Sequence, residues 1–397
     1  MKNAICLIVD GLHIGFVGAY GNSWITTPAM DRLASESALF DRHYINSLDT
    51  SLICRAYWYG LHPEFLPTDE MPDFTGLPSS LLEKGYRTIL LTDDSDIAHN
   101  LFADGFSEVH LIETPSDEKP ASTLEDTQFF RLFATIIDLV SSSDKPYFLW
   151  CHFRGFAGPW DFPMDSRLQY VEEGDPLPYP KTTPPKIVLK TETVEIEDAD
   201  PDVLQSISEA YSGGITAFDE SLDCFMDSFR ENNSFGETLC VLTSFRGFSM
   251  GEHRIIGPPD AWYQTEKRSL LYSENVHIPL LIRYPSGFGA MTRTSSLTQT
   301  GDVFETLCEW FGVDVHKPSQ SLTVLISETT EVLRDKIEII GPGDKAVASS
   351  EWFAKQLKDE MRIELYAKPD DRFEVNEVAD RCEGVAESLL GDMDPER

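Results

Sequence analysis

Apolar segments of strand length alternate with amphipathic segments of helix length over residues 1–320. We predict strands at 4–9, 87–92, 147–152, 238–243 and 278–283. Helices are predicted from residue 28, at 126–140 and at 203–230, where apolar side chains recur with helical spacing. This alternation is typical of an α/β protein with a doubly wound, mainly parallel sheet and helices on both faces.

The segment at residues 4–9 is continuously apolar and leads directly into Asp10. A continuous apolar run is typical of a central parallel strand, because helices cover both faces of such a sheet. Ligands of these sheets bind at the carboxyl ends of the strands. We therefore expect the functional site to lie at the edge of the sheet that Asp10 reaches.

Local patterns outline the elements and domains further. Thr27 followed by Pro28 predicts an N-cap with proline at the first helical position. Residues 161–201 are rich in proline and acids, which indicates a surface excursion. From about residue 321, short β-like pieces at 336–340 and 362–366 precede a helical stretch at 375–390. We expect an α/β domain at 1–320 and a small antiparallel β/α subdomain at 321–397.

The net charge limits the kinds of partner, and the cysteine spacing argues against a disulfide or zinc framework. The 397 residues include 67 acidic and 32 basic side chains, for a formal net charge of −35. So negative a chain is a poor partner for nucleic acid or an anionic membrane, and an anionic substrate needs a local positive pocket. No Cys-x-x-Cys pair occurs, and we expect Cys6, Cys151 and Cys240 to be buried thiols. Without an evident leader or membrane-spanning run, we expect a cytoplasmic protein.

Short motifs in a fixed order cover nearly the whole chain. They lie at 10–22, 27–34, 85–88, 105–106, 148–152, 251–253, 276–283, 364–366 and 376–379. In order and residue type they resemble the signatures of the sulfatase family of the alkaline-phosphatase superfamily. The resemblance implies an alkaline-phosphatase-like fold and, as the inherited activity, hydrolysis of sulfate esters.

The resemblance also implies a site for calcium or magnesium, held by two acids after the first strand and by an Asp with an Asn or His later. Asp10 keeps the first acid, whereas Gly11, Phe245 and Arg246 stand at the other positions. A phenyl ring and a guanidinium offer no oxygen ligand to a hard cation. We therefore expect no metal cofactor, with calcium or magnesium as the candidates if the site is active.

The nucleophile that the resemblance implies, a Cys or Ser oxidised to formylglycine, falls on Ser51, four residues before Arg55. Ile53 stands where the modification motif has Pro or Ala, so the motif is degraded. We favour Ser51 as the N-cap of a helix over Ser51 as a nucleophile. The implied Lys and His that contact sulfate fall on Asp93 and Ser95, which replaces a cationic clamp by an anionic patch.

Three further groups near this edge are candidates for chemistry. His152 ends a predicted strand, and we favour a hydrogen-bonded core or rim histidine over a general base. Cys54, next to Arg55, is favoured as a packed thiol over an activated one. The acids at 93–96 are favoured as a solvated surface run over a new cation site.

Arg246 stands where a metal ligand is implied, so we expect its side chain to fill the space of the cation and pair with Asp10. Such a pair is either purely structural or part of an anion site. In the second case Arg55 and Arg246, with the implied basic position at Lys267 or Arg268, hold sulfate, phosphate or a carboxylate.

The sequence thus predicts a sulfatase-family protein whose inherited hydrolysis is lost or much weakened. Two alternatives stay open. One is a metal-independent hydrolase that uses the hydroxyl of Ser51 or Thr50 as its nucleophile, with arginines such as Arg55 in place of metal. The other is a non-catalytic protein that binds an anion or another partner. A sulfated or phosphorylated small molecule is the expected partner, and nucleic acid and membrane are not.

Overall fold

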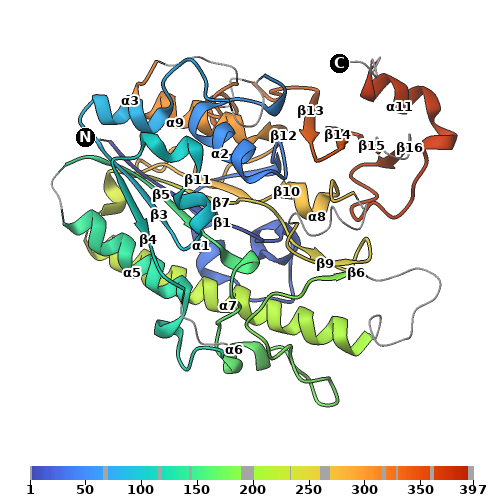
Figure 1. Ribbon diagram of the computed structural model, residues 1–397, viewed down its shortest axis with the longest axis horizontal. Helices are drawn as coiled ribbons and strands as arrows, with labels where there is room; N and C mark the ends of the chain where they lie inside the picture. The colour runs from blue at the N-terminus through green and yellow to red at the C-terminus, as the bar shows by residue number, and fades with distance from the viewer. Residues whose placement is uncertain are drawn as a thin grey trace.

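The computed structural model describes residues 2–65, 70–114, 119–142, 145–188, 201–232, 234–259, 269–314, 319–327, 330–357 and 362–391. A mixed nine-stranded sheet forms the centre of this described part (Figure 1). Its strands are β1 (Asn3–Val9), β2 (Ala38–Tyr44), β3 (Arg87–Thr92), β4 (Glu108–Leu111), β5 (Tyr147–Phe153), β7 (Thr238–Ser244), β10 (His277–Ile278), β11 (Leu280–Arg283) and β12 (Arg293–Gln299).

The strand order is β10-β2-β11-β7-β1-β5-β3-β4, and β12 pairs with β2. The strands from β7 to β4 run parallel, whereas β11 runs antiparallel to both β7 and β2. The prediction of a mainly parallel sheet is therefore confirmed. The predicted strand at 278–283 is divided at Pro279, whose missing N–H cannot join the hydrogen-bond ladder.

Strand β1 lies in the middle of the sheet and is buried on both faces. Alternate side chains of a strand point to opposite faces, so Cys6 joins one hydrophobic core and Leu7 joins the other. Both neighbours of β1 are parallel to it, with Val9 opposite Phe153 of β5 and Ser244 of β7. The carboxyl ends of β1, β5 and β7 therefore meet at one edge of the sheet.

Helices cover both faces of the sheet, as the doubly wound prediction requires. The longer ones are α1 (Pro28–Ser35), α2 (Thr50–Tyr59), α3 (Leu77–Glu83), α5 (Gln128–Ser141), α7 (Pro201–Glu231) and α9 (Thr300–Phe311). Figure 1 shows α2, α3 and α9 on the upper side of the sheet and α5 and α7 on the lower side. The apolar faces of α5 and α7 pack together against the core that contains Leu7.

Helix α1 begins at Pro28 after Thr27, as predicted, but Thr27 does not cap it with its side chain. The hydroxyl of Thr27 instead accepts a hydrogen bond from the N–H of Gly18 at 3.0 Å. The first-turn N–H groups of Ala29 and Met30 donate to the carboxylate of Asp219 in α7, at 2.9 and 2.8 Å. A distant acid therefore satisfies this helix end, which local sequence alone does not reveal.

The segment after Asp161 carries helix α6 (Met164–Leu168) and strand β6 (Ile187–Val188). Strand β6 pairs with β9 (Ile255–Gly257), which also pairs with β8 (Ser249–Met250). Arg167 of α6 is fully buried, and its guanidinium donates to the backbone carbonyls of Trp160, Tyr179 and Lys181. This arginine therefore fixes the described part of the predicted surface excursion, whereas residues 189–200 lie outside the described residues.

The C-terminal part forms the predicted small antiparallel sheet. Its strands are β13 (Lys336–Ile340), β14 (Asp344–Ser349), β15 (Trp352–Leu357) and β16 (Arg362–Ala367), with α11 (Glu383–Leu390) against one face. The helix predicted for 375–390 is wrong over its first half. The N–H of Val378 donates to the carbonyl of Leu365 in β16 at 2.9 Å, so this stretch is tied to the sheet, and a short 3-10 turn at Ala379–Arg381 precedes α11.

The seven cysteines are free, and Cys6, Cys151 and Cys240 are buried, as predicted. Burial raises the pKa of the Cys6 and Cys151 thiols well above the ordinary value, which keeps them protonated. Among the described residues, none of the helices combines the length and the apolar character that crossing a bilayer requires.

Candidate functional site

Four neighbouring parallel strands bring polar side chains to one edge of the sheet. Asp10 follows β1, Asp93 follows β3, His152 lies near the end of β5, and Arg246 comes shortly after β7. The charges of Asp10 and Arg246 both act on the His152 ring. We call Asp10, Asp93, His152 and Arg246 the strand-end site.

Asp10 and Arg246 form a two-bond ion pair at this site. The Nη2 of Arg246 lies 2.5 Å from Asp10 Oδ2, and its Nε lies 3.2 Å from Asp10 Oδ1. The Nη1 of Arg246 also donates to the carbonyl of Leu48 at 3.3 Å. Asp10 is 2% exposed and the Arg246 side chain 13%. The expected bidentate pairing is therefore present in the structure and nearly buried.

The donor set around Asp10 does not fit a calcium or magnesium ion. Both carboxylate oxygens of Asp10 already accept hydrogen bonds from a cation, and hard metal ions need several oxygen ligands. Gly11 has a φ of +77°, and a Cβ there would lie 3.0 Å from the backbone nitrogen of Ala157. An acid at that position is therefore strained as well as crowded. Phe245 contributes only a buried ring.

The ring of Phe245 packs against His152. The two ring centroids are 4.7 Å apart and the planes are nearly perpendicular. His152 is 1% exposed, and neither of its ring nitrogens has a hydrogen-bond partner among the described residues. Burial lowers the pKa of His152 to about 4, against the opposing effect of Asp10, so the ring is neutral near pH 7. The prediction of a hydrogen-bonded core histidine is confirmed in its burial and wrong in its hydrogen bonds, because neither ring nitrogen is bonded within the described part of the chain.

The acids after β3 differ in their surroundings. Asp93 is 6% exposed, and its Oδ1 accepts a hydrogen bond from the N–H of Arg154 at 2.7 Å. Burial raises the pKa of Asp93 to about 7. Asp94 caps the short helix α4 (Ser95–Ala98) by accepting from the N–H of Asp96 at 2.8 Å, and Asp96 is exposed. The solvated surface run that we favoured is therefore wrong for Asp93, which lies inside the protein.

Helix α2 places Ser51 one turn before Arg55. The N-cap of this helix is Asp49, whose carboxylate accepts from the N–H of Leu52 at 3.0 Å. The predicted N-cap role of Ser51 is therefore wrong by two residues, since Ser51 already lies in the first helical turn. Its hydroxyl oxygen accepts a hydrogen bond from the side-chain amide of Asn100 at 3.2 Å. That contact holds the hydroxyl without removing its proton.

Arg55 is fully buried within the same helix. Its Nη2 donates to the carbonyl of Pro63 at 3.4 Å, and its guanidinium carbon lies 5.9 Å from the ring centroid of Phe102. Burial lowers the pKa of Arg55. Arg55 and Arg246 have no common partner among these contacts. A shared anion site of the two arginines therefore stays a prediction. Lys267 and Arg268 lie outside the described residues.

Cys54 lies close enough to the strand-end site for the charge of Arg246 to act on its thiol. Burial nevertheless raises the pKa of Cys54 well above the ordinary value. The thiol is 1% exposed, in agreement with the packed cysteine that we favoured. It is not an activated nucleophile in this state.

The sequence interpretation missed two residues, Arg154 and Asn100. Arg154 fixes Asp93 through its backbone N–H, and its Nε lies 3.8 Å from a carboxylate oxygen of Asp94. A basic residue two positions after the strand predicted at 147–152 is a signal for Arg154, because strand ends of a parallel sheet meet at one edge. Asn100 reaches Ser51 from a different segment, and no local pattern announces that contact.

The sheet topology and the position of the site at its strand ends define an alkaline-phosphatase-like α/β protein. The family model described as Sulfatase matches residues 2–313. The chain therefore belongs to the sulfatase family. An N-acetylglucosamine-6-O-sulfatase of Bacteroides thetaiotaomicron is 28% identical over 120 residues. That match covers 30% of this chain and only 20% of the relative.

Two solved structures illustrate the likeness in fold. A phosphonate monoester hydrolase of Agrobacterium radiobacter is similar with a TM-score of 0.76 and 17% identity, over 98% of this chain and 95% of that one. A protein solved in complex with its substrate D-glucosamine-2-N,6-O-disulfate is similar with a TM-score of 0.76 and 16% identity, over 98% and 96% of the chains. At these identities the likeness concerns the fold.

Proposed function

We propose that this sulfatase-family protein has lost metal-dependent ester hydrolysis and instead binds a small anion at the strand-end site. One observation carries the proposal: the guanidinium of Arg246 makes two hydrogen bonds to the carboxylate of Asp10, the acid that the family pattern assigns to the metal. A cation cannot share those oxygens with a guanidinium at 2.5 Å without displacing it.

The loss follows from the electrostatics of ester cleavage. The negative charge of the sulfuryl group and the charge that develops on the departing alcohol oxygen must be stabilised, and one well-placed electrostatic group is commonly worth about 3 kcal/mol of activation barrier. A barrier increase of that size slows a reaction about a hundredfold. In this chain both groups that would stabilise the charge are replaced. Arg246 stands at an implied metal-ligand position, and Asp93 stands where the resemblance implies a lysine that contacts sulfate.

The remaining positive groups at this edge support binding of an anion. The side chain of Arg246 is 13% exposed and that of Arg154 is 40% exposed, so both reach the surface. Guanidinium N–H groups donate well to the oxygens of sulfate, phosphate and carboxylate. The similar structures include one with a disulfated glucosamine and one named a phosphonate monoester hydrolase. We therefore propose a sulfated or phosphorylated small molecule as the ligand.

Hydrolysis by a serine or threonine hydroxyl is the competing proposal. Its nucleophile would be Ser51 or Thr50, at the start of α2. A hydroxyl nucleophile needs a neighbouring base that accepts its proton. The described partner of the Ser51 hydroxyl is the amide of Asn100, which donates to it. This contact disfavours the competing proposal.

The test combines an assay of turnover with an assay of binding. Hydrolysis of 4-nitrophenyl sulfate and of a 4-nitrophenyl phosphonate monoester is measured with calcium, with magnesium and with chelator, against the Asp10→Asn variant as background. We expect turnover equal to the background in each condition. Turnover that needs a cation contradicts the proposal, and turnover that persists in chelator supports the hydroxyl nucleophile instead.

Binding of sulfate and phosphate is then measured by calorimetry. We expect Arg246→Lys to weaken binding about tenfold, because a single ammonium cannot keep the two-bond pair with Asp10 and also donate to the anion. Arg293→Lys is the matched control, since Arg293 forms a similar pair with Asp41 on the surface. Equal affinities of wild type and Arg246→Lys would show that the anion does not bind at the strand-end site.

A further inference from the structure

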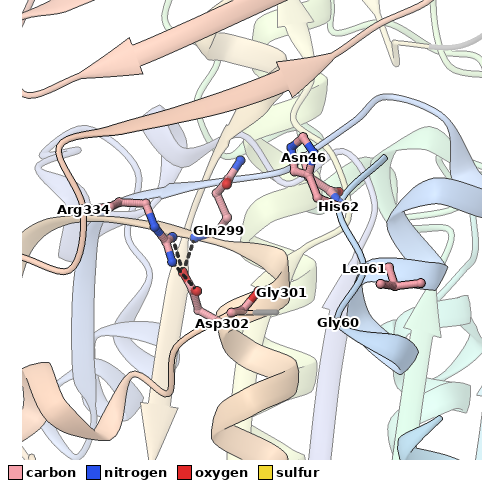
Figure 2. A pocket seen from close by; sticks show the side chains of 9 residues that line it. Asn46, Gly60, Leu61, His62, Gln299, Gly301, Asp302 and Arg334 are labelled. Atoms are coloured by element: carbon pink, nitrogen blue, oxygen red, sulfur yellow. Dashed lines mark hydrogen bonds and ion pairs between the residues drawn. The ribbon is translucent and has the colours of Figure 1, made fainter. Parts of the chain in front are cut away.

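His62 and His253 both lie where the C-terminal part of the chain contacts the rest of the protein. His62 follows α2 and bonds to β13, close to the ion pair of Arg334 with Asp302 (Figure 2). His253 lies in the turn between β8 and β9 and bonds to residues 368–378, which follow β16 and which we call the strap. The two histidines differ in the number of protons that their contacts require.

The contacts of His62 require one proton. Its Nε2 lies 3.0 Å from the carbonyl oxygen of Glu338, and its Nδ1 accepts a hydrogen bond from the N–H of Glu64 at 3.5 Å. A neutral imidazole has one N–H and one acceptor nitrogen, so it satisfies both partners. Burial lowers the pKa of His62, in agreement with a neutral ring near pH 7.

The contacts of His253 require two protons. Its Nδ1 lies 2.7 Å from Oε1 of Glu274 in the short helix α8 (Ser273–Val276), and its Nε2 lies 3.2 Å from the carbonyl oxygen of Glu374 in the strap. A carboxylate and a carbonyl only accept, and a neutral imidazole has one N–H to donate. The two hydrogen bonds together therefore need one proton more than a neutral ring and an ionised carboxylate contain.

The surroundings of His253 favour this extra proton. The side chains of His253, Glu274 and Glu374 are 12%, 5% and 0% exposed. Burial alone would lower the pKa of His253, but the hydrogen bonds and charges of Glu274 and Glu374 outweigh it and raise the pKa above the ordinary value of 6.5. The folded protein therefore binds this proton more tightly than the unfolded chain does. The stabilisation is present at low pH and is lost as the pH rises through the folded-state pKa.

Charged groups from neighbouring elements lie around His253 and its stacking partner Tyr272, whose ring centroids are 3.5 Å apart. In the described part of the chain these groups pair with one another: Lys355 with Glu364 at 2.9 Å, Lys368 with Glu374 at 2.8 Å, and Glu252 with His13 at 3.5 Å. The ion-pair partner of Glu274 is instead His253. His253 is therefore the group whose protonation balances the charge of Glu274.

Glu374 also ties the strap to α8 through its side chain. Its carboxylate accepts hydrogen bonds from the N–H of Ser273 at 3.0 Å and from the Ser273 hydroxyl, and it pairs with Lys368. Because these donors already satisfy the carboxylate, the cluster does not fit a metal ion. The bond from His253 fixes the backbone of the same residue, so both parts of Glu374 are held.

We propose that His253 is a proton-dependent clasp that holds the strap against α8. When the extra proton leaves, the remaining proton stays on Nδ1, because a hydrogen bond to a carboxylate is stronger than one to a carbonyl. The bare Nε2 then faces the carbonyl oxygen of Glu374, and two acceptors do not bond. The strap therefore opens more often at high pH than at low pH. This clasp does not depend on the anion that we propose for the strand-end site.

Hydrogen exchange of the full chain, read by mass spectrometry between pH 6 and 9, measures this opening. Each rate is divided by the rate of an unstructured peptide at the same pH, which removes the intrinsic effect of pH. We expect protection of the amides at 374–378 to fall about tenfold with rising pH, the equivalent of one lost hydrogen bond. Protection of β13, which His62 contacts, should stay constant. A strap whose protection is independent of pH, or changes no more than that of β13, overturns the proposal.

Substitutions assign the effect to His253. His253→Gln has no ring to titrate, so we expect its strap protection to be independent of pH. His62→Gln is the matched control and should keep the pH profile of the wild type, because the His62 ring is already neutral. Glu274→Gln removes the charge that retains the proton and should move the midpoint of the profile down by about one pH unit or more.

A wild-type pH profile in folded His253→Gln overturns the proposal, and so does an unchanged midpoint in Glu274→Gln. If His253→Gln does not fold, the comparison of the strap with β13 in the wild type still decides.

Discussion

At the scale of single residues, Arg246 and Asp10 depend on each other. Both groups are largely removed from water, so each would be an uncompensated buried charge without its partner. Leu48 adds a backbone carbonyl to the same guanidinium. Each partner therefore keeps the other from being a buried unpaired charge, whether or not a ligand is present.

Removal of the arginine should expose this dependence. We expect Arg246→Ala to lower the free energy of unfolding by about 3 to 5 kcal/mol, because Asp10 is left buried and unpaired. Arg293→Ala breaks a pair whose side chains are 54% and 28% exposed, and should cost about 1 kcal/mol or less. Urea denaturation of both variants checks the difference. Equal losses of unfolding free energy would mean that the buried Asp10 pair contributes no more to stability than the exposed Arg293 pair.

Asp93 should make stability depend on pH. Its pKa is about 7 in the folded protein against an ordinary value of 3.8, so the folded state binds this proton more tightly than the unfolded state. Stability from this group is therefore present below about pH 4 and is lost as the pH rises to about 7. The loss amounts to roughly 4 to 5 kcal/mol, from about 1.4 kcal/mol for each of about three pKa units.

The comparison of Asp93→Asn with wild type isolates that contribution, because asparagine does not titrate and still accepts from the N–H of Arg154. Relative to wild type, we expect the variant to be more stable near pH 8 than near pH 5, measured by urea denaturation. Asp96→Asn, at an exposed position, should differ from wild type by about 0.5 kcal/mol or less at both pH values. A pH-independent difference for Asp93→Asn would contradict the raised pKa.

Some residue contacts follow from the sequence and others do not. The pairing of Asp10 with Arg246 was predictable, since both follow apolar strands of one parallel sheet. The burial of Asp93 was not, because a run of acids looks like a solvated loop until its contact with Arg154 is known. The N-cap Asp49 was also predictable, because it is a favoured capping residue two positions before Ser51.

At the scale of elements, α6 and α7 approach each other closely at Gly213. A Cβ at Gly213 would overlap the carbonyl of Ser166 and lie 2.5 Å from the Cα of Arg167. That close approach keeps buried Arg167 over the carbonyls that it binds. A glycine inside a long helix, normally unfavourable, is therefore required at this crossing.

Alanine at two helical glycines should have opposite effects. We expect Gly213→Ala to destabilise the protein by about 1 to 3 kcal/mol, because the added methyl group has no space. Gly384→Ala in α11 meets nothing within 4 Å and should stabilise by up to about 1 kcal/mol through helix propensity. Thermal unfolding of the two variants checks the signs. Stabilisation by Gly213→Ala would contradict the close contact of α6 with α7.

The predicted elements were those with strong hydrophobic patterns. Strands β1, β3, β5 and β7 are continuously apolar, so their periodicity locates them closely. Strand β12 was missed because its sequence, RTSSLTQ, has no hydrophobic run and its first half is mostly exposed. It forms by pairing with β2, which is a contact distant in sequence. Tertiary pairing of this kind overrides local propensity.

At the scale of the whole molecule, the net charge of −35 opposes compaction. Salt screens repulsion among exposed charges, since the Debye length falls from about 10 Å at 0.1 M to about 3 Å at 1 M. We therefore expect the melting temperature to rise by several degrees between about 0.1 and 1 M KCl. Sorbitol at equal osmolality is the control and should give a smaller rise. A melting temperature that is flat or falls with KCl would contradict this expectation.

The metal content of the purified protein shows whether a cation or Arg246 neutralises Asp10. After dialysis against calcium and magnesium and removal of free ions, mass spectrometry counts the metal bound to each chain. We predict far less than one equivalent, and the same content in Asp10→Asn, because Arg246 already holds both carboxylate oxygens. One equivalent in the wild type that disappears in Asp10→Asn would show that a metal, and not Arg246, pairs with Asp10.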